Sequence, residues 1–272
     1  MRTIVHLSDL HFGRLDPQLI APLLASVREL NPHLVVISGD LTQRARATEF
    51  REARAFLDKL DAPILVVPGN HDQPLYNVIE RMVDPLRRYR RYITPDLAPV
   101  FTDAEIIVVG LNSTRTFSSR HGSGRVNRSQ IDQAVAQLSS ARAPVTKIVV
   151  THHPFDLPTG YAPEHLIGRA TMAMRQLAAV GADLFLAGHL HRSHVSGSAE
   201  RYRIAGHRAL VVQAGTLSTR ERGELNAFNV IRLAAPDAAV EHHTWDSEGH
   251  RFTRSWTGEY RHEPDGWKNT SR

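Results

Sequence analysis

The strongest constraint on the fold is a regular alternation of short apolar runs with stretches of helical periodicity. Thr3–Leu7, Leu34–Ile37 and Ile64–Val67 have the length and the residue types of buried strands, and a helical pattern of apolar side chains follows each of the first two. The alternation continues through three later apolar runs, Ile106–Leu111, Lys147–Thr151 and Leu184–Ala187. Strands that alternate with helices predict a largely parallel sheet covered by helices, so an α/β protein is expected.

The last part of the chain has a different pattern. Ala209–Gln213, Ala227–Leu233 and Ala239–Trp245 resemble successive strands with little helix between them, which predicts a second, partly antiparallel sheet packed on the first. Residues 1–258 are therefore expected to form a single domain. Residues 259–272 are polar and rich in charge, and we expect them to form a mobile tail.

Side chains with the chemistry of metal ligands stand directly after five of the expected strands. The five segments are Asp9-Leu10-His11, Gly39-Asp40, Gly69-Asn70-His71-Asp72, His152-His153-Pro154 and Gly188-His189-Leu190-His191. In parallel α/β sheets, ligands bind at the carboxyl ends of the strands, so one edge is expected to collect these carboxylates, imidazoles and the amide. In an extended Asp-x-His or His-x-His segment, both side chains point to the same side.

Composition narrows the chemistry that such an edge can support. The 272 residues include 16 His and no Cys, so thiolate metal sites, iron–sulfur clusters, disulfides and thiol nucleophiles are excluded. Nitrogen and oxygen donors suit Mn, Fe, Zn, Co or Ni. Two such ions ~3.5–4 Å apart can hold the attacking and leaving oxygens of an in-line displacement, and a carboxylate is the natural bridge between them.

Charge and hydropathy argue against other classes of protein. Lys and Arg exceed Asp and Glu by 33 to 28, a net charge of +5 that is modest for this length. An independent DNA enzyme usually has a stronger basic surface, so no stable nucleic-acid partner is expected. No segment approaches the ~20 apolar residues of a membrane span, and the N-terminus lacks the apolar core of a secretory signal. We expect a cytoplasmic protein, and a homo-oligomer is left open.

The five segments resemble the motif blocks of the calcineurin-like metallophosphoesterase superfamily, in the same order. The blocks are D-x-H, G-D, G-N-H-[D/E], a His after a strand, and G-H-x-H; each is weak alone, but five in order are specific. The resemblance runs from residue 3 to about residue 232, and the layout is similar to the bacterial branch of class III cyclic-nucleotide phosphodiesterases. It implies a four-layer αββα sandwich, in which helices flank two mixed β-sheets.

The resemblance also implies a role for each matched residue. Two sets of metal ligands are implied, namely Asp9, His11, Asp40 and His191 for a first ion, and Asp40, Asn70, His152 and His189 for a second. His71 resembles the general acid that protonates the leaving oxygen, and Asp72 would orient it. A metal-bridging hydroxide would attack phosphorus, with two divalent ions as cofactors, Mn or Fe before Zn, Co or Ni.

The implied activity is hydrolysis of a small organic phosphodiester, with a cyclic nucleotide as one candidate substrate. A phosphomonoesterase or DNA nuclease of the same superfamily is the alternative, and a non-catalytic binding module is a remote one, because no ligand type is missing. The candidate substrate contacts are His153, Arg220 and Arg222. The basic segment 81–91 could bind a phosphate and a stacked base, although a solvated basic helix with tyrosine packed beneath it is the more ordinary interpretation.

Overall fold

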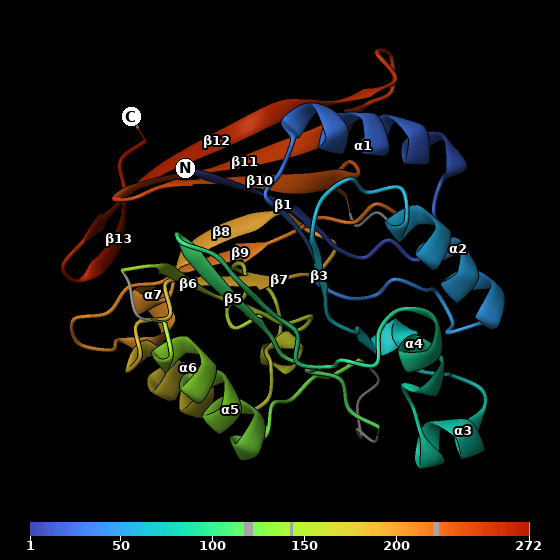
Figure 1. Cartoon of the computed structure of the whole chain (residues 1–272), viewed down its shortest axis with the longest axis horizontal. Coiled ribbons are helices and arrows are strands. Elements are labelled where there is room, and N and C mark those ends of the chain that lie inside the picture. The colour runs from blue at the N-terminus through green and yellow to red at the C-terminus, as the bar shows by residue number, and fades with distance from the viewer. Residues whose placement is uncertain (117–121, 142–143, 220–222, 272) are drawn as a thin grey trace.

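Two β-sheets packed face to face form the centre of the protein, and helices cover their outer faces (Figure 1). The computed structural model describes residues 1–116, 122–141, 144–219 and 223–271. The first sheet has the strand order β13-β12-β11-β10-β1-β2-β3, and the second has the order β4-β5-β6-β7-β9-β8. The strands are β1 (Arg2–Leu7), β2 (Leu34–Ile37), β3 (Ile64–Val66), β4 (Val100–Thr102), β5 (Ile106–Gly110), β6 (Thr146–Val150), β7 (Leu184–Ala187), β8 (His194–Gly197), β9 (Leu210–Gln213), β10 (Ala227–Ala234), β11 (Asp237–Asp246), β12 (Arg251–Glu263) and β13 (Gly266–Asn269).

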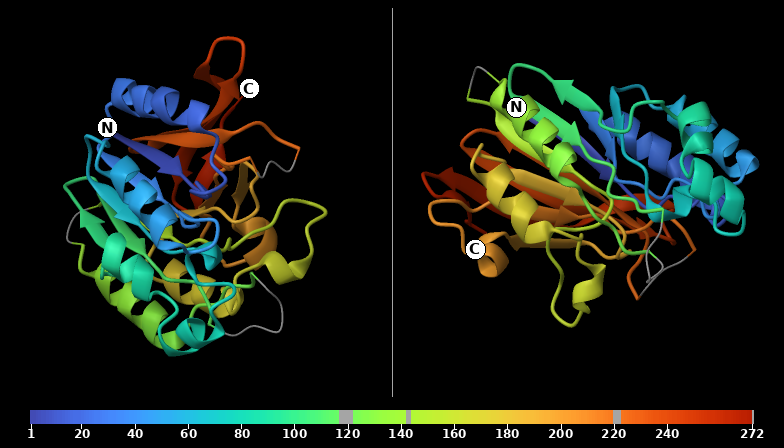
Figure 2. Two further views of the ribbon diagram at one scale, coloured as in Figure 1. Left: turned by 90° about the vertical axis from the view of Figure 1, so that its right-hand side faces the viewer. Right: turned by 90° about the horizontal axis from the view of Figure 1, so that it is seen from below.

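The helices lie on both outer sides of the paired sheets. They are α1 (Pro17–Leu30), α2 (Ala47–Leu57), α3 (Val78–Val83), α4 (Arg87–Tyr92), α5 (Arg128–Ser139), α6 (Ala170–Ala178) and α7 (Ala199–Tyr202), with the 3-10 turns η1 (Asn70–Asp72) and η2 (Pro163–His165). Figure 2 shows α1 and α2 in blue on one side of the strands, and α5 and α6 in green to yellow on the other. In the described part of the chain, no helix combines the length and apolarity needed to cross a membrane.

Three apolar clusters correspond to the three interfaces between four layers. One cluster packs α1, α2 and α4 against the first sheet, one lies between the two sheets, and one packs α5 and α6 against the second sheet. The alternation of side chains along β1 explains this arrangement, since Ile4 belongs to the inter-sheet cluster while Val5 and Leu7 belong to the cluster under the helices. The predicted four-layer αββα sandwich with two mixed sheets is confirmed.

The strands expected from the sequence are present, but their division between sheets differs from the prediction. The parallel strands are split, with β1 to β3 in the first sheet and β5 to β7 in the second. Of the C-terminal strands, β9 joins the second sheet, while β10 and β11 pair onto the first beside β1. Periodicity reports which faces of a strand are buried and not which neighbour it pairs with, so the partition was not readable from the pattern.

The predicted mobile tail beginning at Glu259 is wrong. Residues 259–263 complete β12, and β13 pairs with them in register from Tyr260↔Asn269 to Glu263↔Gly266. Tyr260 and Trp267 are buried in the inter-sheet cluster, whereas Glu259 and Arg261, on either side of Tyr260, are exposed. A hairpin at a sheet edge can expose one face to solvent. The polar residues of that face gave this segment the composition of a tail. That the chain forms a single domain stays a prediction.

Candidate metal centre

The predicted ligands lie at the carboxyl ends of strands from both sheets. Asp9 and His11 follow β1, Asp40 follows β2, and η1 follows β3, all in the first sheet. His152 follows β6, and the segment 188–191 follows β7, both in the second sheet. Because the two sheets are stacked with these ends on the same side (Figure 1), residues nearly two hundred positions apart come into contact, as in the hydrogen bond from His189 N to Asp9 Oδ2 at 2.9 Å.

A first group of donors is formed by Asp9, His11 and His191. Asp9 Oδ1 lies 3.1 Å from His191 Nε2 and 3.5 Å from His11 Nε2. The two imidazole Nε2 atoms are themselves 3.0 Å apart. All three side chains are buried.

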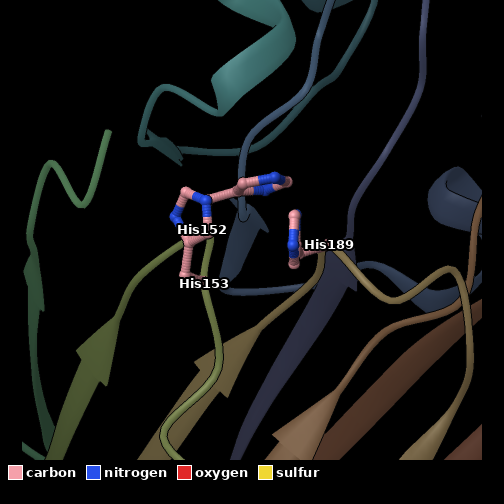
Figure 3. A group of neighbouring side chains, drawn as sticks. All are labelled: His152, His153 and His189. Atoms are coloured by element: carbon pink, nitrogen blue, oxygen red, sulfur yellow. The ribbon is translucent and has the colours of Figure 1, made fainter. Parts of the chain in front are cut away.

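A second group of donors is formed by Asn70, His152 and His189. Asn70 Oδ1 lies 3.1 Å from both His152 Nε2 and His189 Nδ1. Figure 3 shows the rings of His152 and His189 brought together with that of His153 at the ends of their strands. Unlike the first group, this one contains two partly exposed residues, Asn70 and His189.

Asp40 stands between the two groups. Its Oδ2 lies 3.7 Å from His11 Nε2 of the first group and 3.3 Å from His152 Nε2 of the second. Its Oδ1 accepts a hydrogen bond from His71 N at 2.8 Å. The carboxylate that sequence reasoning assigned as a bridge thus lies within 3.7 Å of a ring nitrogen in each group.

The backbone at the strand ends adopts conformations that L-residues rarely take. Ten non-glycine residues of the described chain have positive φ, and five of them are predicted ligands: Asp9 (φ 53), His11 (φ 47), Asp40 (φ 52), His189 (φ 73) and His191 (φ 57). Such left-handed residues are uncommon and concentrate at functional sites. Gly69 lets the chain pass close to Asp40, since a Cβ at Gly69 would lie 2.1 Å from Asp40 Oδ1. The strand ends are therefore shaped around these side chains.

The donor atoms fit a pair of metal ions. Ligand atoms ~2.1 Å from one ion and at right angles to each other are about 3.0 Å apart, close to the separations within each group. Asp9 Oδ1 is buried and accepts no hydrogen bond from any described donor. The ring nitrogens Nδ1 of His11 and His152 face the carbonyl oxygens of Thr42, at 3.3 Å, and Ser38, at 2.8 Å. A carbonyl only accepts, so the proton sits on Nδ1 and the Nε2 lone pair faces the cluster.

The electrostatics of the cluster also favour a cation. Burial opposes ionisation of Asp40, yet the imidazoles of His152 and His71 hold the pKa of its carboxyl well below the usual range. Burial likewise disfavours the imidazolium of His152, but the Asp40 carboxylate raises the pKa of that ring to about 9. The carboxylates therefore stabilise positive charge at a point from which water is largely excluded.

His71 lies beside the cluster, and its orienting partner differs from the prediction. Its ring is edge-on to that of His11, with centroids 4.8 Å apart. Among the described residues, the partner of His71 Nδ1 is the carbonyl oxygen of Gln43, at 2.8 Å. The predicted orienting contact from Asp72 is wrong, because that carboxylate is turned toward backbone N–H groups.

Asp72 instead ties two loops together. It accepts hydrogen bonds from the backbone of Gly69 at 2.9 Å, Leu41 at 3.3 Å and Thr42 at 2.9 Å, and from Thr42 Oγ1 at 3.0 Å. Burial and the Asp40 carboxylate raise the pKa of Asp72, while the hydrogen-bond donors oppose that rise. The side chain thereby fixes the loop after β2, which carries Asp40, against the turn after β3, which carries Asn70.

His153 has both ring nitrogens engaged by the protein. Its Nε2 donates to the carbonyl of Gly122 at 2.9 Å, so its Nδ1 accepts from Ser113 Oγ at 2.8 Å. Burial lowers the pKa of this ring to about 3, and a Cβ on Gly124 would lie 2.1 Å from it. The predicted substrate contact through His153 would require these hydrogen bonds to break. The other two predicted contacts, Arg220 and Arg222, lie outside the described residues.

Several arginines of the basic segment 81–91 are engaged by nearby protein groups. Arg88 pairs with Glu80, and Arg90 pairs with Asp84. Arg81 Nε donates to the carbonyl of Thr116 at 3.0 Å. Tyr89 is fully buried. This agrees with the more ordinary interpretation of the segment, a solvated basic helix with tyrosine packed beneath it.

Sequence reasoning missed the groups that hold the ligands in place. Ser8 Oγ donates to Asp9 Oδ2 at 2.7 Å, and the carbonyls of Ser38, Thr42 and Gln43 accept from the rings described above. A backbone carbonyl is present in every residue, so residue type does not reveal which carbonyl binds a ring. Only Ser8, directly beside the first block, offered a signal.

Comparison with known proteins supplies a family for this arrangement. The family model described as calcineurin-like phosphoesterase matches residues 2–193, which is most of the chain. A cAMP/cGMP dual specificity phosphodiesterase of Mycobacterium tuberculosis is 27% identical over 214 residues, covering 70% of this chain and 62% of the relative. The glycerophosphodiester phosphodiesterase GpdQ of Enterobacter lignolyticus is 29% identical over 182 residues, covering 58% of this chain and 59% of the relative. The matches therefore span about three fifths of the length of these relatives.

Solved structures share the fold at low sequence identity. A dimetal phosphatase from Danio rerio has a TM-score of 0.66 at 14% identity and covers 93% of this chain and 98% of its own. A purple acid phosphatase from yellow lupin has a TM-score of 0.70 at 11% identity and covers 94% of this chain and 53% of its own. The predicted resemblance, including that to the bacterial cyclic-nucleotide phosphodiesterase branch, is confirmed. The chain belongs to the calcineurin-like phosphoesterase family.

Proposed function

We propose that the chain is a metal-dependent phosphodiesterase that hydrolyses a small organic phosphodiester at two divalent cations, with a cyclic nucleotide as one candidate substrate. The observation that carries the proposal is the position of Asp40, whose Oδ2 lies within 3.7 Å of a ligand nitrogen in each of two donor groups. One carboxylate shared by two groups is what a cation pair ~3.5–4 Å apart requires.

In such a site the two donor groups and His71 would have different roles. When bound, two divalent cations supply Lewis acidity that polarises the phosphoryl group and lowers the pKa of the attacking water. The two donor groups would hold and orient the cations, and the nitrogen and oxygen donors suit Mn or Fe, with Zn, Co or Ni as alternatives. Because the Gln43 carbonyl keeps a proton on His71 Nδ1, Nε2 is the atom that would give a proton to the leaving oxygen.

The preference for a diester is supported by the relatives. Those named above are a cAMP/cGMP dual specificity phosphodiesterase and a glycerophosphodiester phosphodiesterase, and both names describe cleavage of diesters. The structural neighbours named as phosphatases share the fold only. A phosphomonoesterase, a nuclease and a non-catalytic binding module are therefore outcomes that the test must separate from the proposal.

The test measures, on one preparation, the rates of cleavage of two aryl esters and of DNA, together with the metal content. Protein stripped with a chelator and reloaded with Mn²⁺ is assayed with bis(4-nitrophenyl) phosphate, 4-nitrophenyl phosphate and single-stranded DNA, and its metal content is measured by elemental analysis. We expect two ions per chain and a kcat/KM for the diester above that for the monoester. Faster cleavage of the monoester or of DNA, or the absence of specific metal uptake, would contradict the proposal.

A further inference from the structure

An aromatic pair borders the second donor group on the side of residues 157–168. The His165 ring, at the end of η2, lies 5.9 Å from the His189 ring, measured between centroids. The Tyr161 ring lies 6.0 Å from His165 at an interplanar angle of 78°. Both residues are only partly buried, and the nearer ring, that of His165, lies beside a predicted metal ligand.

The backbone just after His165 is anchored to two neighbouring segments. Ile167 N donates to the carbonyl of Pro154 at 3.0 Å, and Gly168 N donates to the carbonyl of Gly124 at 2.9 Å. Gly168 also forms a parallel bridge with Arg125. His165 is therefore presented from a segment tied both to the strand end that carries His152 and to residues 124–126, so binding a ligand there would require little reordering.

Arg192 adds a guanidinium group that is paired with Glu224. It directly follows His191, and its Nε donates to Glu224 at 2.8 Å, while nearly half of its side chain stays exposed. The Glu224 carboxylate first, and then the Tyr161 hydroxyl, raise the pKa of the Arg192 guanidinium. Aromatic faces beside a guanidinium are the surface on which planar heteroaromatic rings stack.

Two classes of ligand bind partly exposed aromatic rings such as these. A quaternary ammonium group also binds aromatic rings, and because Arg192 is paired with Glu224 the local charge does not exclude it, so the test includes phosphocholine. A planar base can stack on the exposed face of such a ring, and because His165 lies beside His189, a phosphate joined to the base would reach toward the donor groups. Resting on the proposed function, we infer that Tyr161 and His165 form a subsite for the heteroaromatic base of a nucleotide-type ester, and that they select such esters over those of glycerol or choline.

The test measures binding of three phosphate monoesters to the Mn²⁺-loaded protein by calorimetry. The ligands are adenosine monophosphate, ribose 5-phosphate and phosphocholine, which differ in the group attached to the sugar or phosphate. In His165→Asn and in Tyr161→Leu we expect the Kd of adenosine monophosphate to rise about tenfold, while the Kd of ribose 5-phosphate changes much less. Tyr161→Phe keeps the ring and should retain most of the affinity.

The matched control is His250→Asn, in a hairpin away from the donor groups. His250 also packs edge-on against an aromatic ring, Trp245, at 6.2 Å, and it should leave all three Kd values unchanged. Equal weakening of adenosine monophosphate and ribose 5-phosphate, no weakening of either, or selective loss of phosphocholine would each overturn the inference. Failure to cleave bis(4-nitrophenyl) phosphate would instead contradict the proposed function, and the binding data would still decide the subsite.

Discussion

The two donor groups differ in charge and in exposure. The first contains its own carboxylate, Asp9, and its three side chains are buried. The second has the neutral amide of Asn70 in that place, and both Asn70 and His189 are partly exposed. A carboxylate in a dry site attracts a cation far more strongly than an amide dipole does. We therefore expect the first group to hold its ion tightly and the second to be where ligand and solvent enter.

The largest effect should come from the residue that belongs to both groups. Asp40→Asn replaces the shared carboxylate with an amide and should lower kcat/KM for a phosphodiester by at least about 10³-fold, because neither group keeps its bridge. Elemental analysis should show fewer than two ions per chain. Asp61→Asn is the control, since Asp61 is largely exposed and pairs with Arg28 at the surface. Retention of two ions and of activity in Asp40→Asn would refute the bridging role.

His71 belongs to neither group, so its loss should separate chemistry from metal binding. His71→Ala should lower kcat by about 10²–10⁴-fold, the usual worth of a general acid, with the metal content unchanged. A leaving group that needs no proton is the internal control. The decrease should therefore be much smaller for a 4-nitrophenyl ester than for an alkyl ester. Equal decreases for both esters would show that His71 does not act as the acid.

A charge exchange between the groups tests the comparison directly. Asp9→Asn should weaken the tighter site, and Asn70→Asp should strengthen the weaker one, each by about 10–100-fold in metal affinity. Titration of chelator-stripped protein with Mn²⁺ would resolve the two affinities. If Asp9→Asn weakens only the looser of the two sites, the assignment of the groups is reversed.

The sequence predicted the candidate ligands better than it predicted the groups that hold them in place. Asp9, Asp40 and His152 were identifiable because residue type and position after a strand are both visible in the chain. The partner of the His71 ring was not, because it is a backbone carbonyl, and every residue has one. Asp72 was misassigned for the same reason, since its N–H partners are likewise main-chain groups. The edge hairpin that contains Trp267 was mistaken for a tail because only one of its faces is apolar.

The smallest effect we expect is on stability and tests the revised role of Asp72. Asp72→Asn places an NH₂ group where one carboxylate oxygen now accepts from the backbone, leaving buried donors unpaired at a cost of about 2 kcal/mol in the free energy of unfolding. Because Asp72 joins the loop of Asp40 to the turn of Asn70, the second group of the variant should also lose its ion at a lower chelator concentration than in the unsubstituted protein. Chemical denaturation and chelator titration measure the two effects, with the exposed Asp61→Asn again expected to change stability by no more than about 0.5 kcal/mol. A variant with unchanged stability but lost turnover would return Asp72 to a role in orienting His71.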